Sequence, residues 1–169
     1  MCPLYLWRFV LGESMRNLVN VISTIVVLAT PRSVAEPQVA SVNRAVLTWS
    51  VFSCATYAEL SGDAVEQKRL FEIGYRSAKA FVAAVENQTL PETERLNAPL
   101  GILMLLEGPS ADFIVGRIFE SAMRNAYDDV VTRDNSGAPL RDPLQWASGE
   151  TKTMKAREKY QSANCALIR

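Results

Sequence analysis

Residues 41–60 read SVNRAVLTWSVFSCATYAEL, and this stretch decides the fold. When the residues are placed at helical spacing, the apolar side chains fall on two stripes. The stripes consist of Val42, Ala45, Val46, Trp49 and Phe52, and of Leu47, Val51, Cys54 and Ala58. A helix that is apolar on two sides is packed between other helices. We therefore expect a central helix that ends near Leu60 and has Ser41 as its N-cap.

Helical patterns continue from this stretch to the C-terminus, and no segment shows the alternation typical of a β-strand. The chain breaks at Gly62, and Ser110 is a residue type that caps helix N-termini. Further helices are expected over 63–87, 91–97, 100–106, 110–131 and 150–163, and a long loop over 132–149. The sequence thus predicts an all-α fold, a single globular domain of about five helices.

Three of these segments carry predictions about packing. Gly74 and Ala78 lie on the core face of the second helix, where their small size permits a neighbouring helix to approach closely. The run LGILMLL over 100–106 has no polar side chain, so we expect a fully buried helix that stops before Gly108-Pro109. The expected core face of the helix over 110–131 consists of Val115, Phe119, Ala122, Met123, Ala126 and Val130.

The N-terminal part of the chain has the pattern of a secretory signal peptide. Arg16 precedes 13 almost wholly apolar residues, Leu18–Thr30, and Ser33-Val34-Ala35 forms a small-x-small cleavage site. The same segment could instead be an uncleaved membrane anchor or a helix of the core. A helix that spans a membrane needs about 20 apolar residues, and this segment is shorter. We expect residues 1–35 to be a signal peptide, with Met15 as the true start. The mature domain, residues 36–169, would then be periplasmic or extracellular.

The mature chain keeps two of the three cysteines, Cys54 and Cys165. An even number of cysteines in an exported protein favours a disulfide, which would tie the last residues to the central helix. In the chain-entropy model, closing a loop of about 100 residues stabilises the fold by about 4.7 kcal/mol. The alternative is a pair of buried free thiols.

The composition disfavours several classes of function. The 18 basic and 18 acidic residues give a net charge of zero, whereas nucleic-acid binders usually carry a basic excess. The chain has no histidine, so an activated cysteine nucleophile lacks its usual base. With both mature cysteines paired, no zinc-ligand set remains, and no calcium-loop or phosphate-loop spacing occurs. We therefore expect no metal and no cofactor.

Arg117, Glu120 and Arg124 form the densest charge pattern in the chain. Glu120 lies three residues after Arg117 and four before Arg124, and pairs at these spacings stabilise a helix by about 0.2–0.5 kcal/mol each. The simplest interpretation is a solvated helix face. Alternatively, the three residues are a recognition surface for an anionic partner, with Glu120 positioning the two arginines.

Two carboxylates are candidates for acid–base chemistry. Glu120-Ser121, within FESAMRNAYD over 119–128, resembles the Glu-Ser of lytic transglycosylases, in which a buried glutamate on a helical fold is the general acid. The resemblance covers under ten residues, and the chain lacks that family's downstream Gly-Leu-Met-Gln-type segment. Glu107 and Asp112 flank a tight turn, where helix ending and capping also explain the residue types. A glycan-acting hydrolase or lyase using Glu120 or Glu107 is the alternative function.

Trp146 is the most unusual residue of the long loop. Leu140, Pro143 and Leu144 accompany it and give an apolar tip inside a polar segment. The tip either folds back on the core or forms an exposed anchor for a partner. The leading expectation is a small exported helical protein that acts by protein–protein binding, possible surface residues being Arg117, Glu120, Arg124 and Trp146. By analogy of size, export and disulfide, an immunity or inhibitor protein fits this class.

The export hypothesis predicts the first residue of the mature protein and of its precursor. Intact mass and N-terminal peptide mapping of protein from its own host should give a chain that begins at Glu36, because signal peptidase cleaves after small-x-small sites. The precursor should begin at Met15. A peptide that spans Ser14-Met15, or a mature chain that retains residues 18–30, would contradict the hypothesis.

Overall fold

A computed structural model of the chain describes residues 43–169. The predicted signal peptide, the start at Met15 and the predicted N-cap at Ser41 lie outside the described residues. The helices are α1 Arg44–Leu60, α2 Ala64–Glu86, α3 Glu92–Leu96, α4 Leu100–Leu103, α5 Ala111–Val131 and α6 Gly149–Ser162, with short 3-10 turns at Pro143–Gln145 and Cys165–Leu167. Residues 43–169 contain no β-strand, only an isolated bridge between Arg133 and Pro139. The predicted all-α fold is confirmed.

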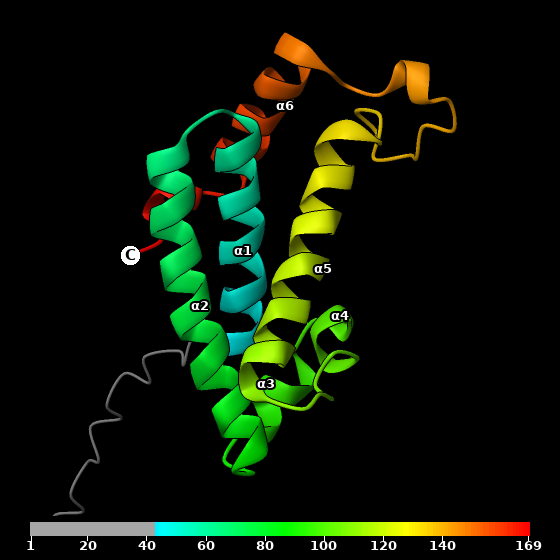
Figure 1. The fold of residues 1–169 in the computed structure, drawn as a ribbon. Helices are drawn as coiled ribbons and strands as arrows, with labels where there is room; N and C mark the ends of the chain where they lie inside the picture. The colour runs from blue at the N-terminus through cyan, green and yellow to red at the C-terminus, as the bar shows by residue number, and fades with distance from the viewer. Residues whose placement is uncertain (1–42) are drawn as a thin grey trace, which may run out of the picture. The chain divides into compact units, whose positions relative to one another are not determined.

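Helix α1 is the centre of the bundle, with α2, α5 and α6 packed around it (Figure 1). The side chain of Asn43 caps the helix by accepting hydrogen bonds from the backbone N–H of Ala45 and Val46, at 3.0 and 3.1 Å. This cap makes Arg44 the first residue of the helix. Val46, predicted to be apolar core, is exposed instead.

The core consists of two clusters that share α1. One joins α1 to the C-terminal segment and includes Val51, Cys54, Leu70, Ala126, Ala156 and Cys165. The other joins α1 to α2, α4 and α5 and includes Phe52, Ala78, Phe81, Ile102, Ile118 and Ala122. Because both sides of α1 are buried, the prediction of a sandwiched helix is confirmed.

Helices α1 and α2 approach each other closely at Gly74. A Cβ atom placed at Gly74 would lie 2.6 Å from the ring of Phe52 and 3.3 Å from the side chain of Val51. Both neighbours are fully buried, so neither has free space to move into. The predicted close approach at Gly74 is confirmed, and Ala78 is also fully buried one turn further along α2.

The segment 100–106 differs from its prediction. It forms only the four-residue α4, in which Ile102 is fully buried and Leu100 is 70% exposed, and Met104, the residue after the helix, is 72% exposed. A single turn between Pro99 and Gly108 lies on the surface and buries one face, so the prediction of a fully buried helix is wrong. Gly101 lies against the ring of Trp49, where a Cβ would come within 3.1 Å.

The C-terminal segment is bound to the bundle by few side chains. Helix α6 is polar, and Ala156 is its one buried residue. Cys165 forms a disulfide with Cys54 of α1, with the Cα atoms 5.6 Å apart and a sequence separation of 111. The Arg69 guanidinium also donates a hydrogen bond of 2.7 Å to the backbone carbonyl of Ile168. The predicted Cys54–Cys165 pair is confirmed in position.

Among residues 43–169, no helix is both long enough and apolar enough to cross a membrane.

A matched pair of glycine substitutions tests the α1–α2 packing. Gly74→Ala should lower the free energy of unfolding by about 1–3 kcal/mol, because the new methyl group overpacks the site against Phe52. Gly116→Ala, at an exposed position of α5 where no atom lies within 4 Å of the added Cβ, should raise the free energy of unfolding by about 0.5–1 kcal/mol. Urea unfolding measures both values. Equal effects of the two substitutions would contradict the close approach.

The disulfide is tested by thiol chemistry and stability together. The denatured protein without reductant should show no free thiol from Cys54 or Cys165. The double variant Cys54→Ala, Cys165→Ala should lose about 2–5 kcal/mol of unfolding free energy, because its unfolded chain is no longer cross-linked. Two free thiols in the native protein, with unchanged stability in the double variant, would show that the bridge does not form.

Candidate protein-binding face

An aromatic row runs from the core to the surface between α2 and α5. The ring of Phe119 lies 5.1 Å from that of Phe52 and 5.1 Å from that of Phe71, both in edge-on contact. Phe71 stacks on Tyr75 with the ring centroids 6.2 Å apart. Phe52 is fully buried, whereas Tyr75 is 39% exposed. The buried ring therefore anchors the exposed ones in fixed positions.

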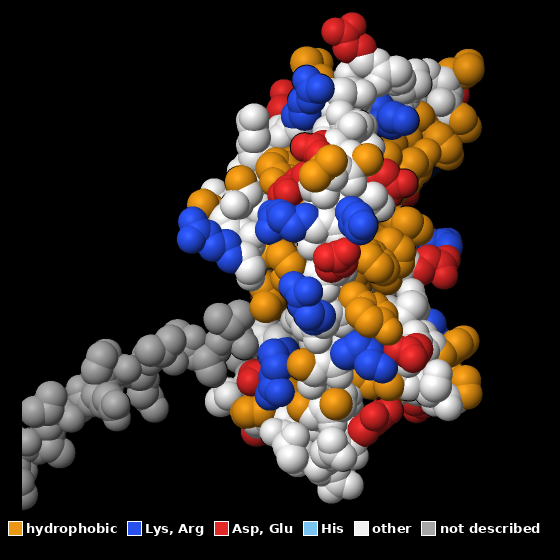
Figure 2. Space-filling view, turned by 60° about the vertical axis from the view of Figure 1, so that its left-hand side comes forward, with side chains coloured by type: hydrophobic (Ala, Val, Ile, Leu, Met, Phe, Trp, Pro, Cys, Tyr) orange, Lys and Arg blue, Asp and Glu red, His pale blue; other side chains and the backbone are white. Residues whose placement is uncertain are grey.

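The apolar surface continues along α5. Phe119, Met123 and Tyr127 follow one another at four-residue spacing, so they lie on one side of the helix. Met123 and Tyr127, with Leu60 of α1, line a hollow of about 310 Å³. We call Phe71, Tyr75, Phe119, Met123 and Tyr127 the aromatic face. Figure 2, which looks from the side of α2, shows hydrophobic side chains gathered in a column beside lysine and arginine side chains.

Polar contacts fix the end of the aromatic face near the start of α5. Asp112 accepts a hydrogen bond of 2.9 Å from the Tyr75 hydroxyl and one of 2.8 Å from the Lys79 ammonium. These two donors, Lys79 first, lower the pKa of the Asp112 carboxyl below its ordinary value. The same bond to Asp112 raises the pKa of Tyr75. Tyr75 is thereby oriented as a neutral phenol at the edge of the apolar surface.

The predicted ladder of Arg117, Glu120 and Arg124 divides into two parts. The carboxylate of Glu120 pairs with Arg124 at 2.8 Å, and both side chains are largely exposed. Arg117 instead donates a 2.6 Å hydrogen bond to the backbone carbonyl of Glu107 and lies over the ring of Phe113. The structure therefore does not bring Glu120 to both arginines. Arg124 also lines the hollow beside Met123 and Tyr127, which places it at the rim of the aromatic face.

Neither predicted acid–base carboxylate has the surroundings of a general acid. Glu120 is exposed and ion-paired with Arg124, and Glu107 is exposed in the turn before α5. A general acid that works near neutral pH usually needs a raised pKa, which burial without a cationic partner provides. The hollow that contains Glu120, also lined by Leu105, Arg117, Ser121 and Arg124, measures only about 200 Å³.

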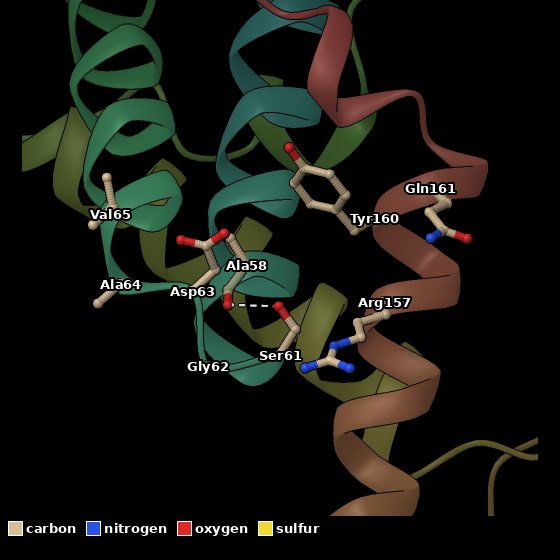
Figure 3. A pocket seen from close by; sticks show the side chains of 9 residues that line it. All are labelled: Ala58, Ser61, Gly62, Asp63, Ala64, Val65, Arg157, Tyr160 and Gln161. Atoms are coloured by element: carbon tan, nitrogen blue, oxygen red, sulfur yellow. Dashed lines mark hydrogen bonds between the residues drawn. The ribbon is translucent and has the colours of Figure 1, made fainter.

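A third hollow, of about 590 Å³, lies between the α1–α2 turn and α6. The Arg157 side chain extends from α6 toward Ser61 of the turn, whereas the Tyr160 ring points away from the turn and the Gln161 side chain stays close to α6 (Figure 3). The polar groups of the turn are already engaged, since Ser61 donates to the carbonyl of Ala58 and Asp63 accepts from the backbone N–H of Glu66. This hollow is thus the seam where α6 meets the α1–α2 turn.

Tyr160 holds α6 to α2 next to that seam. Its hydroxyl donates a 2.5 Å hydrogen bond to the Glu66 carboxylate, which Arg69 also binds through two nitrogens at 2.6 and 2.7 Å. Burial, followed by the neighbouring Glu66, raises the pKa of Tyr160 to about 12. Tyr160 therefore stays a neutral donor, which suits a structural bond better than proton transfer.

Trp146 lies apart from the aromatic face, in the loop between α5 and α6. Its indole N–H donates to the carbonyl of Leu140 at 3.3 Å, and the side chain remains 39% exposed. The loop thus folds the ring partly back on itself, while Leu144 is 93% exposed. Among residues 43–169, no group of three histidine, cysteine, aspartate or glutamate side chains could hold a metal ion.

The aromatic face was not found from the sequence. Phe119 and Met123 were assigned to the core, and Phe71, Tyr75 and Tyr127 were not singled out. The spacing of Phe71 to Tyr75, and of Met123 to Tyr127, is the sequence signal for a second apolar stripe beside each core stripe.

No protein-family model matches the chain, and no curated protein or solved structure matches it either.

Proposed function

We propose that this chain is an exported helical protein that acts by binding another protein through the aromatic face. The observation that supports this proposal is the row of partly exposed rings that packs on the buried ring of Phe52. Aromatic side chains, methionine and arginine are enriched at the centres of protein interfaces, and Met123 and Arg124 supply the latter two here. Rings held in place before binding lose little conformational freedom when a partner covers them.

The chemistry of the face indicates the kind of partner. Its apolar stripes on α2 and α5 lie beside α1, and a further helix with one apolar side would fill such a site. The Glu120–Arg124 pair at the rim offers both signs of charge to polar groups of that helix. We propose an envelope or secreted protein as this partner, masked in the manner of an immunity or inhibitor protein.

The Cys54–Cys165 pair supports the exported location. Both cysteines are almost fully buried, and a disulfide between them persists in an oxidising compartment such as the periplasm or the exterior of the cell. The predicted signal peptide would deliver the chain to that compartment. Export and protein binding remain the two parts of this proposal, and each has its own test.

Site-specific photo-crosslinking tests the binding face. A benzophenone amino acid at Tyr127 or Tyr75, in protein expressed in its own host, should give one adduct of defined mass, because the partner covers these rings. The matched position is Glu158, which is exposed on α6 and does not belong to the aromatic face. Tyr127→Lys should remove the adduct formed at position 75, since it places a charge in the apolar contact.

Two outcomes would overturn the proposal. Adducts of equal yield at Glu158 and Tyr127, or none at Tyr127 and Tyr75, would show that the aromatic face is not an interface. Hydrolysis of cell-wall glycan by the purified protein, lost in a folded Glu120→Gln or Glu107→Gln variant, would favour the enzyme class instead.

A further inference from the structure

The loop between α5 and α6 is held in one shape by its backbone. Leu140 N–H donates to Thr132 at 2.7 Å, Ala147 N–H to Val131 at 3.0 Å, and Asp134 N–H to Ala138 at 2.9 Å. This loop and the start of α6 border a shallow hollow of about 630 Å³ that is open to solvent. A hollow built on hydrogen-bonded backbone is present before any ligand arrives, which lowers the cost of binding.

The charged side chains that line this hollow are occupied by the protein itself. The Lys155 ammonium donates to the carbonyl of Arg133 at 2.8 Å, and Arg133 pairs with Asp129. Asp134 accepts hydrogen bonds from the backbone of Ser136 and of Ala138 and from the Ser136 hydroxyl. These internal contacts lower the pKa of Asp134. The charges therefore build the loop and leave no strong site for an ion.

The other polar side chains that line the hollow are uncharged and have no hydrogen-bond partner within residues 43–169. They are Asn135, Gln145, Ser148 and Thr151. Together they present amide donors and acceptors and two hydroxyl groups. Trp146 lines the same hollow with a partly exposed indole, whose N–H is already bonded to Leu140. The ring consequently contributes an apolar surface and no free donor.

From this combination we infer that the hollow is a saccharide-binding site. A sugar ring has hydroxyl groups around its edge and a face of C–H bonds. Amide and hydroxyl side chains match the hydroxyls as donors and acceptors, and an indole matches the C–H face. An anion would leave the indole unused, and a cation would lie beside the positive charges of Arg133 and Lys155. A wholly apolar ligand would leave the four polar side chains desolvated without partners. This site is separate from the aromatic face and does not depend on the proposed protein partner.

Titrations with defined sugars test the inference. Probes are triacetylchitotriose, cellotriose and maltotriose, followed by a printed glycan array, and the readout is tryptophan fluorescence with calorimetry. At least one saccharide should bind with saturation. Asn135 and Thr151 are exposed, and replacing either leaves the indole of Trp146 in place. Asn135→Ala and Thr151→Ala should each weaken binding about tenfold, which corresponds to about 1.4 kcal/mol. Trp146→Ala should abolish binding in calorimetry.

Leu144→Ala is the matched control, because Leu144 lies beside these residues in sequence but is not part of the lining. It should bind the saccharide as the unchanged protein does. Circular dichroism and thermal unfolding verify that each variant is folded. The inference is overturned if no saccharide on the array binds, or if Asn135→Ala, Thr151→Ala and Trp146→Ala all bind as tightly as the unchanged protein.

Discussion

The contact between Phe52 and the bare backbone at Gly74 is the constraint on which the rest of this bundle depends. Phe52 occupies the space that any side chain at position 74 would need, so α1 and α2 lie closer together there than larger residues would allow. The same ring meets Phe119 of α5, and Phe119 meets Phe71. A single buried ring thus sets the position of α2, of α5 and of the exposed rings that extend from them.

A second constraint acts at the other end of the chain. Helix α6 buries only Ala156, far too little apolar surface to hold a 14-residue helix in place alone. Cys165, the Tyr160–Glu66 bond and the Arg69–Ile168 bond supply the attachment. Ser148 and Thr151 of the saccharide hollow lie at the start of this helix, where the bond from Lys155 to the carbonyl of Arg133 attaches α6 to the loop. The disulfide therefore stabilises the fold from the opposite end of α6 to this hollow.

Features of this fold that depend on residues close together in sequence could be predicted, whereas features that depend on tertiary packing could not. The break at Gly62 and the cap at Ser110 act through nearest neighbours in sequence, and Gly74 and Ala78 follow the helical spacing of the core residues of α2, so each was predictable. The segment 100–106 was not, because its burial depends on how the chain approaches α4 after Pro99, which composition does not encode. The aromatic face and the loop hollow were also missed. Their residues come from different elements, and only the packed bundle shows which rings stay exposed and which polar side chains stay free.

The two surfaces have different chemistry, and this bears on how such a protein would work. The aromatic face offers rigid rings and suits a folded partner, whereas the hollow beside Trp146 offers neutral hydrogen-bonding groups and suits a hydrophilic ligand. They lie on different elements, since the face uses the middle of α2 and α5 and the hollow uses the loop after α5. A protein with both would bind its partner while attached to an envelope glycan. Even weak saccharide binding would then raise the local concentration of the chain where that partner acts, so the combined affinity would exceed that of either site alone.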